Sequence, residues 1–329
     1  MPAIMSVAEK QISADIFDRL RAGFARVAAL ATHVRINEDR LHAYARDLLA
    51  SPPPPVFDTE HHYVGSPEDT AAYVLTLDAI NYGSGYKAAL AAEGWDVIEG
   101  SIYYSVSVRL KQAFDVQLLT ACDLSAMTPE RVRDILQLPD GPQSMRVSSL
   151  FATGLSDLGR MIERDHAGLF MNFVQAAQGK AAYIVEQLAQ LPQFADVHSY
   201  KGADVAFYKR AQIAAADLHL AFTHLGLSLF DDMGRLTMFA DNGVPQVLEA
   251  DHVLIYDPAL KARIVRGEEI ASGSAEEVEI RGCGAHAVEK LAMLLNKTAV
   301  QTDHILWHRH AEDPRYRAHP SHRTLSVYY

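Results

Sequence analysis

Four segments of the chain are more polar than their neighbours, and they hold the side chains that could carry chemistry. The first contains the adjacent pair His61 and His62, and the last contains Asp303, His304 and His308. In chain order the segments are FDTEHHYVGSPEDT, FYKRAQ, LTMFADNGVPQVL and TDHILWHRH. Imidazole nitrogen and carboxylate oxygen atoms are metal ligands, so a metal centre is the first chemistry to consider.

The two histidine pairs support a metal site only in part. His304 and His308 lie one helical turn apart, which is the spacing of a metal-ligand pair on one helix face. That helix offers no third ligand at a matching offset, although Asp303 is close. Paired histidines before a turn are usually solvated, which is the simpler interpretation of His61 and His62. A metal-dependent hydrolase that uses all four histidines therefore stays an alternative.

The other two segments also have simple interpretations when each is taken alone. Lys209 and Arg210 begin an expected helix, where a Lys-Arg pair is usually a surface pair. Asp241 follows an apolar run and precedes Asn242 and Gly243, a position typical of a turn or a helix cap. None of these signals is specific by itself.

Helical signals dominate the sequence around these segments. The expected helix N-caps, each followed by apolar residues at helical spacing, are Ser13, Asn37, Ser66, Thr128 and Ser274. Ser274 and Glu277 also form a capping-box pattern, and the last helix is expected to carry DHILWH. The run DVHSYKGADVAF alternates around Lys201-Gly202, which predicts a short β-hairpin.

The expected fold class is therefore mainly α with a short β-hairpin. The sequence shows no internal repeat and no low-complexity linker. We expect a single mostly helical catalytic unit over residues 1–329, with two lobes and a cleft between them. The helices within residues 1–55 are the least well marked, and the prolines from Pro52 to Pro55 are the best boundary because proline ends helices.

Charge and composition restrict the partners. The 329 residues carry a formal net charge of −11, whereas a protein that wraps a nucleic acid needs Lys and Arg to replace counterions. We therefore expect no nucleic-acid partner, although a single phosphate needs only one or two local cations. No apolar stretch approaches the roughly 20 residues of a membrane helix, and we expect no secretory signal, because no basic start followed by an apolar run is seen. With only Cys122 and Cys283, a reducing cytoplasmic setting is expected.

Several segments together resemble one protein family. FYKRAQI, LTMFADNGVPQVL, EEVEIRGC and HRTLSVYY resemble, in the same order, segments of the queuosine salvage proteins, which are queuosine 5′-phosphate N-glycosidases. LTLDAINYGSGY resembles the stretch before that family's pocket. The resemblance spans roughly residues 60 to 329. It departs at Tyr82 and Asn242, where many members carry phenylalanine and tyrosine, and at His304 and His308, where some relatives carry a tyrosine and an acid.

The resemblance implies a fold and an activity. The family is similar in fold to the helix-hairpin-helix DNA glycosylases, in which a lysine on one helix and an aspartate just before a following helix face the same sugar. Lys209 and Asp241 resemble that pair in order and context. The implied reaction is hydrolysis of queuosine 5′-phosphate to queuine and ribose 5-phosphate, with a small nucleotide as the partner and no metal or other cofactor. A non-catalytic nucleic-acid-binding module is the second alternative.

Residue roles follow from the chemistry that the resemblance implies. Asp241 would stabilise the positive charge on the sugar or attack the anomeric carbon. A 7-deazaguanine has no N7 to protonate, so the protein must hold and stabilise the leaving base, with Phe239 positioning the ring. Asp303 would pair with the ammonium of the base's side arm. Lys209 or Arg210 would hold the 5′-phosphate. The remaining expected substrate-binding residues are His61, His62, His304, His308 and Tyr86.

Overall fold

The structure is a computed structural model that describes residues 15–48 and 55–329. It is mainly helical with short strands, so the expected class is confirmed at that level. The N-terminal elements are α1 (Ile16–Leu30), β1 (Val34–Ile36) and α2 (Glu38–Asp47). They are followed by α3 (Pro67–Asp78), α4 (Lys87–Ala92), α5 (Ile102–Val116), α6 (Ala121–Ser125), α7 (Pro129–Leu136), α8 (Pro142–His166), α9 (Phe170–Ala176) and α10 (Ala181–Leu188).

The second half of the chain alternates strands and helices before it becomes fully helical. Its elements are β2 (Val197–Tyr200), β3 (Ala203–Ala206), α11 (Lys209–His224), α12 (Gly243–Ala250), β4 (Leu254–Tyr256), α13 (Pro258–Val265), α14 (Ala275–Leu295), α15 (Ala299–Glu312) and α16 (Pro314–Ala318). The segment DHILWH lies in α15, so it is not in the last helix as expected, because the short α16 follows a break at Asp313 and Pro314.

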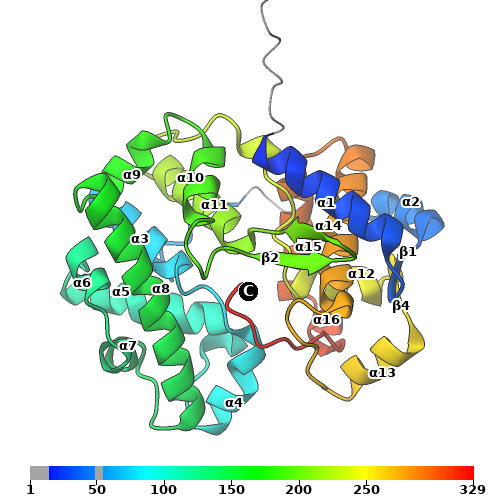
Figure 1. Cartoon of the computed structure of the whole chain (residues 1–329), viewed down its shortest axis with the longest axis horizontal. Helices are drawn as coiled ribbons and strands as arrows, with labels where there is room; N and C mark the ends of the chain where they lie inside the picture. Colours follow the sequence, from blue (N-terminus) through cyan, green and yellow to red (C-terminus); the bar gives the residue numbers. More distant parts are fainter. Residues whose placement is uncertain (1–14, 49–54) are drawn as a thin grey trace, which may run out of the picture.

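Two groups of helices form the molecule (Figure 1). Helices α3 to α10 gather on one side, and α1, α2 and α12 to α16 gather on the other. α11 packs on α3 and α10, whereas α14 packs on α1, α15 and α2. The hairpin and the last residues of the chain lie between the two groups in this view. No helix of the described residues is long and apolar enough to cross a membrane.

The helix starts follow local capping chemistry. Side chains at the expected caps Asn37, Ser66, Thr128 and Ser274 each accept a backbone N–H from the first turn. α1 is capped by Asp15, which accepts from Asp18 N at 3.0 Å, and Ser13 lies outside the described residues. The reciprocal capping box at Ser274 is absent, because the Glu277 carboxylate accepts from Gly273 N at 3.1 Å instead.

The predicted hairpin is confirmed. β2 and β3 are antiparallel, with Val197 opposite Ala206 and Tyr200 opposite Ala203. Lys201 and Gly202 form the turn with φ angles of 45° and 83°, which is the left-handed geometry that a two-residue hairpin loop requires. A second antiparallel pair, β1 with β4, was not predicted, because it joins three-residue strands from distant parts of the chain.

α14 is the most buried long helix in the described part of the chain. Every residue from Glu277 to Ala285 is buried, so the helix lacks the polar face of a surface helix. Its neighbours α1, α12 and α15 surround it. Three fully buried ionic side chains, Glu277, Glu279 and Arg281, project from it. Because an unpaired buried charge is costly, each of them must have partners inside the molecule.

The last residues of the chain run through the interior. Thr324 Oγ1 donates to the Ile270 carbonyl oxygen at 2.8 Å, and Gly83 N donates to the Tyr329 carbonyl oxygen at 3.3 Å. A Cβ at Gly85 would lie 2.1 Å from the Thr324 carbonyl oxygen, so only glycine fits there. The turn after α3 therefore packs directly against this segment.

Candidate active site

Lys209 lies at the first position of α11 and points into the interior. Its side chain is buried, and within residues 15–48 and 55–329 its ammonium forms no ion pair with a carboxylate. Burial lowers the pKa of Lys209, and the charges of Asp241 and Asp78 only partly oppose that effect. A buried ammonium that lies near carboxylates without touching them is suited to contact a ligand.

Asp241 is held at the N-terminal end of α12. Its Oδ1 accepts from the backbone of Gly243 at 2.8 Å and of Val244 at 3.4 Å. The helix N-terminus stabilises the negative charge. In the described part of the chain no residue donates a hydrogen bond to Oδ2, so the second oxygen is left for a ligand. The His310 ring is close by, since a Cβ at Gly243 would lie 3.3 Å from it and 3.6 Å from Oδ1.

Asp303 lies on the buried face of α15, next to Asp241. Its Oδ1 accepts from the backbone N–H of Phe239 at 3.2 Å. Burial raises the pKa of Asp303 well above its usual range, and the charge of Asp241 raises it further. Burial therefore favours the protonated form of Asp303 when no cation is bound. A cationic ligand would favour its ionised form.

Two further acids in this cluster were not predicted. Asp78, at the end of α3, is fully buried; its Oδ1 accepts from Asn81 Nδ2 at 3.1 Å, and its Oδ2 has no partner among the described residues. Burial, and then the charge of Asp217, raises the pKa of Asp78 well above its usual range. Burial raises the pKa of Asp217 to about 7. Asp78 lies in LTLDAINYGSGY, whose resemblance to the stretch before the family's pocket was a signal, whereas Asp217 is a single aspartate in a mostly apolar helix.

Lys209 is the common neighbour of these carboxyl groups. Its charge lowers the pKa of Asp78, of Asp217 and of Asp303, and the charge of Asp241 in turn raises the pKa of Lys209. The two residues expected to be catalytic therefore lie in one group, in which Lys209, Asp78 and Asp303 are buried and Asp217 and Asp241 are half-buried. We call Lys209, Asp78, Asp217, Asp241 and Asp303 the carboxyl cluster.

Arg210 is engaged by backbone carbonyl groups of neighbouring segments. Its side chain is buried, and its guanidinium donates to the backbone carbonyl oxygens of Asp78, Ala79 and Gln193. The guanidinium carbon lies 4.6 Å from the ring centre of Tyr82 and 4.4 Å from that of Phe194. These contacts fasten the end of α3 to α11, so the placement favours a structural role over phosphate binding.

His62 is the better placed of the two N-terminal histidines. Its Nδ1 lies 2.8 Å from the Asp58 carbonyl oxygen and its Nε2 lies 2.6 Å from the Tyr103 hydroxyl. Burial lowers the pKa of His62, so the neutral ring donates through Nδ1 and accepts from the hydroxyl. Burial raises the pKa of Tyr103 well above its usual range, and the charges of Asp217 and then Asp78 add to this effect. Tyr103 therefore joins His62 to the carboxyl cluster.

Of the remaining candidates, Phe239 has a hydrogen bond to the carboxyl cluster, through its backbone to Asp303. His61 pairs with Asp58 at 2.6 Å and lies 3.4 Å from Glu99. The rings of His304 and His308 are perpendicular at 4.4 Å, and His308 pairs with Glu312 at 3.1 Å. Phe239 is half-buried in the loop before Asp241, and Tyr86 is buried below Arg146. No metal-binding group of three or more His, Cys, Asp or Glu side chains occurs in the part of the chain that the structure describes, so nothing favours the metal-dependent alternative.

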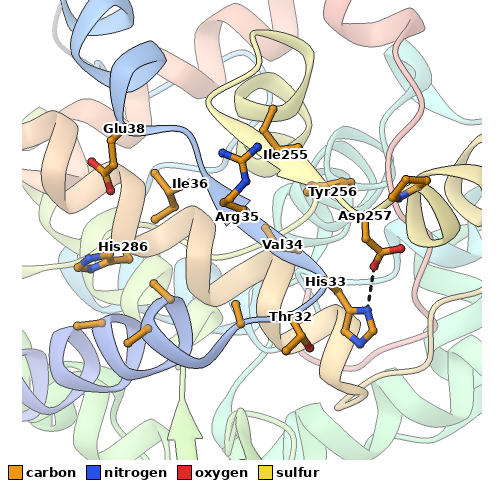
Figure 2. A pocket seen from close by; sticks show the side chains of 15 residues that line it. Thr32, His33, Val34, Arg35, Ile36, Glu38, Ile255, Tyr256, Asp257 and His286 are labelled. Atoms are coloured by element: carbon orange, nitrogen blue, oxygen red, sulfur yellow. Dashed lines mark hydrogen bonds and ion pairs between the residues drawn. The ribbon is translucent and has the colours of Figure 1, made fainter.

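Two surface hollows lie elsewhere. The larger one, of about 620 Å³, lies between α1, β1, β4 and α14 and is lined by residues that include Arg35, Glu38 and His286 (Figure 2). His33 and Asp257 pair across its rim at 2.8 Å. The smaller hollow is on α8 and the end of α10. Neither of these two hollows is lined by a member of the carboxyl cluster.

Comparisons with known proteins assign the family. Residues 61–329 match the family model described as "Queuosine salvage protein". The chain is 35% identical over 314 residues to the "Queuosine 5'-phosphate N-glycosylase/hydrolase" of Sphaerobacter thermophilus, covering 92% of this chain and 95% of that protein. The protein of the same name from Dictyostelium discoideum is 31% identical over 334 residues, covering 94% and 98%. The one from Mus musculus is 28% identical over 285 residues, covering 80% and 83%. On this evidence, which covers most of its length, the chain belongs to the queuosine salvage protein family.

Proposed function

We propose that this chain is an N-glycosidase that hydrolyses queuosine 5′-phosphate to queuine and ribose 5-phosphate. Support comes from the name shared by the relatives, which are similar over most of the chain. The observation that carries the proposal is the proximity of the buried Lys209 to the half-buried Asp241 in the carboxyl cluster. Nothing favours either the metal-dependent hydrolase or the non-catalytic nucleic-acid-binding module.

The chemistry assigns Asp241 to the sugar. When the bond between the anomeric carbon and N9 breaks, its electron pair leaves with the base, and positive charge builds on the anomeric carbon and ring oxygen. Oδ1 of Asp241 is fixed by the α12 backbone, so Oδ2 is oriented to face this charge. Water then adds its oxygen to the anomeric carbon, and its proton balances the charge on the released base.

The protonated acids suit the leaving base. A 7-deazaguanine has no N7 to protonate, so the departing ring must spread its electron density over its other polar atoms. A neutral carboxyl group can donate a hydrogen bond to such an atom, and burial favours the neutral form of Asp303 and Asp78 by raising the pKa of each. We assign Asp303 to the base or its ammonium arm, with Phe239 beside the ring and His62 at the other side of the pocket.

The 5′-phosphate requires a cation. Lys209 is our candidate, because Arg210 is engaged by backbone carbonyl groups. Lys87 and Arg317 are further cations in this region, since their charges add to burial in lowering the pKa of His310, which lies beside Asp241. The phosphate would enter the site from the side of Lys87, Arg317 and His310.

For the fold, we propose the helix-hairpin-helix DNA glycosylase type, arranged as one catalytic unit of two lobes with a cleft between them. The support is positional. Lys209 begins a helix, Asp241 lies just before the next helix, and both side chains reach the same cluster. Such a scaffold acting on a free nucleotide needs no duplex opening.

The phosphate role is tested by comparing two substrates. The purified protein is expected to release queuine from queuosine 5′-phosphate much faster than from the unphosphorylated nucleoside. The reason is that a phosphate on a positioned cation supplies binding energy that orients the sugar. Mass detection of the freed base gives both rates. Equal rates would remove the phosphate role, and no release from either compound would end the proposal.

We also propose that nucleic acid is not a partner. The net charge of −11 opposes an electrostatic complex with a phosphate backbone. Titration of duplex DNA and of transfer RNA at physiological salt is expected to show no tight binding. A submicromolar complex whose affinity falls steeply with salt would contradict this expectation.

A further inference from the structure

Two segments that resemble the family contribute no residue to the carboxyl cluster. They are EEVEIRGC, within α14, and HRTLSVYY, which spans residues 322–329. Their polar side chains meet in the interior with one residue that precedes β2. The members of this network are Asp196, Glu277, Arg281, His322 and Tyr329, and all five are buried. We call it the buried bracket.

Arg281 is the centre of the buried bracket. Its side chain is 0% exposed, and it forms a two-pronged ion pair with Asp196 at 3.0 Å and 2.5 Å. It also reaches Glu277 at 3.2 Å. The guanidinium carbon lies 4.0 Å from the ring centre of Phe207 and 4.6 Å from that of Tyr329. A planar guanidinium held by a carboxylate on its edge and by rings has little freedom to move.

The bracket reaches the backbone of both residues assigned to catalysis. Arg281 Nε donates to the carbonyl oxygen of Ala240 at 2.9 Å, and Ala240 immediately precedes Asp241. The Lys209 backbone N–H donates to Asp196 Oδ2 at 3.4 Å. One ion pair thus joins the peptide before Asp241 to the first peptide of α11. Neither Asp196 nor Arg281 belongs to the carboxyl cluster itself.

Glu277 and residues 322–329 hold Arg281 from the other side. The Tyr329 hydroxyl donates to Glu277 Oε1 at 3.0 Å and lies 3.2 Å from His322 Nε2. Burial lowers the pKa of His322 to about 4, so the neutral ring can donate through Nε2 to the hydroxyl oxygen. The second oxygen of Glu277 accepts from Gly273 N at 3.1 Å. The ionic groups of the bracket are therefore well satisfied.

Stability alone does not explain such a network. Replacing a buried ion pair by apolar side chains of similar volume is often neutral or stabilising, because desolvation cancels the Coulomb attraction. What the pair offers is directional contact with two peptide groups at once. Burial by itself would raise the pKa of Asp196, but Arg281 and His198 lower it to about 2. The pair of Asp196 and Arg281 consequently stays ionised at neutral pH.

We propose that Arg281, held by Asp196, Glu277 and Tyr329, is a positioning residue that fixes the Asp241 carboxylate relative to Lys209. This inference rests on the proposed function. A positioning residue of this kind acts on turnover through Asp241 and has no contact with the substrate. Its loss therefore lowers kcat and leaves KM nearly unchanged, since misplacing a catalytic group by a fraction of an ångström weakens transition-state stabilisation first.

The test is a double-mutant cycle on queuosine 5′-phosphate turnover. Arg281→Lys keeps the positive charge but loses the two-pronged contact. It is expected to lower kcat on the order of 10-fold in the otherwise unchanged protein. In the Asp241→Asn background the same change is expected to lower kcat by less than about twofold, because the group that Arg281 positions is already inactive. An equal loss in both backgrounds, or an unchanged kcat, would overturn the proposal.

Glu279→Gln is the matched control for a purely structural effect. Glu279 is on the same helix, is fully buried, and accepts backbone N–H groups of Thr32, His33 and Val34 at 2.8, 2.5 and 3.1 Å. Those residues border the hollow of Figure 2, away from Asp241. Glu279→Gln is expected to lower Tm with kcat per folded molecule unchanged. If its kcat fell as far as that of Arg281→Lys, the effect would be general loosening, and positioning would be rejected.

Tyr329→Phe keeps the inference testable if Arg281→Lys does not fold. The ring stays over the guanidinium, and only the hydroxyl contacts with Glu277 and His322 are lost. A loss of about threefold in kcat, confined to the background with Asp241 intact, supports the proposal. No loss, or an equal loss in both backgrounds, rejects it. Because the unchanged protein is assayed first, absence of any turnover would instead reject the proposed function.

Discussion

Asp241→Asn is expected to lower kcat by about 10²-fold or more, the scale for losing one preorganised electrostatic group. The amide keeps the shape of the carboxylate, and its oxygen can still accept from Gly243 and Val244 at the start of α12. What is lost is the negative charge that faces the sugar in the transition state. Binding of the substrate should survive, because this charge matters most where positive charge develops.

Asp257→Asn is the matched control for that change. Asp257 also caps a short helix, with Ala259 N at 2.9 Å and Leu260 N at 3.0 Å, but it lies at the rim of the hollow in Figure 2. Its asparagine variant should keep normal kcat. Steady-state kinetics with thermal melts of both variants gives the comparison. Near-normal turnover by folded Asp241→Asn would remove Asp241 from the chemistry.

Asp303→Ala should have the second largest effect. Loss of a charge-assisted hydrogen bond inside the pocket should reduce kcat/KM by about 1.5–3 kcal/mol, which corresponds to roughly 10- to 150-fold. His62→Ala should act in the same direction, since its partner Tyr103 borders the carboxyl cluster. Chelator should leave kcat/KM unchanged, both in the variants and in the unchanged protein, because no metal takes part in the proposed reaction.

Asp303 could act by pairing with the ammonium arm or by accepting the Phe239 backbone N–H, and two comparisons separate these roles. Asp303→Asn keeps an acceptor for that N–H but cannot become anionic. A 7-deazaguanosine 5′-phosphate without the arm gives the second comparison. If Asp303 pairs with the arm, both variants lose much less activity on the armless substrate. Equal losses on both substrates would limit Asp303 to holding the loop, and unchanged kcat/KM in folded Asp303→Ala would exclude any part in the pocket.

The sequence predicts the local features of this fold because their causes are local. Asn37 and Ser66 cap helices through their own side chains, and Lys201-Gly202 makes the hairpin turn from two adjacent residues. The β1–β4 pairing depends on Val34–Ile36 meeting Leu254–Tyr256. Strands of three residues have too little periodicity to indicate such a partner.

In the candidate site, too, some residues could be predicted from the sequence and others depend on tertiary packing. Lys209 and Asp241 were found through ordered segments that resemble a family, and the structure brings both into one cluster. Asp217 was missed because a single acid in an apolar helix has no motif; only tertiary packing buries it beside Lys209. Arg210 follows Lys209 in the chain, yet helical geometry turns it about 100° away, and it binds the carbonyl groups at the end of α3.

The contacts of Arg281 also could not be predicted from the sequence. The sequence marked EEVEIRGC by resemblance alone and gave no hint of what the segment contacts. Its partners Asp196 and Ala240 are brought to it only by the folding of the whole chain. The contact of Arg281 with the peptide before Asp241 depends on tertiary structure, which no periodicity or motif spacing can express.

The most direct test of the central claim follows the oxygen of water. The purified protein is incubated with queuosine 5′-phosphate in water enriched in ¹⁸O, with chelator present. The masses of the products are then measured by mass spectrometry. Hydrolysis of the N-glycosidic bond is expected to release unlabelled queuine and an equal amount of ribose 5-phosphate with one ¹⁸O at the anomeric position, provided that analysis precedes exchange of that hydroxyl. Label found in inorganic phosphate, or no free queuine at all, would contradict the proposed reaction.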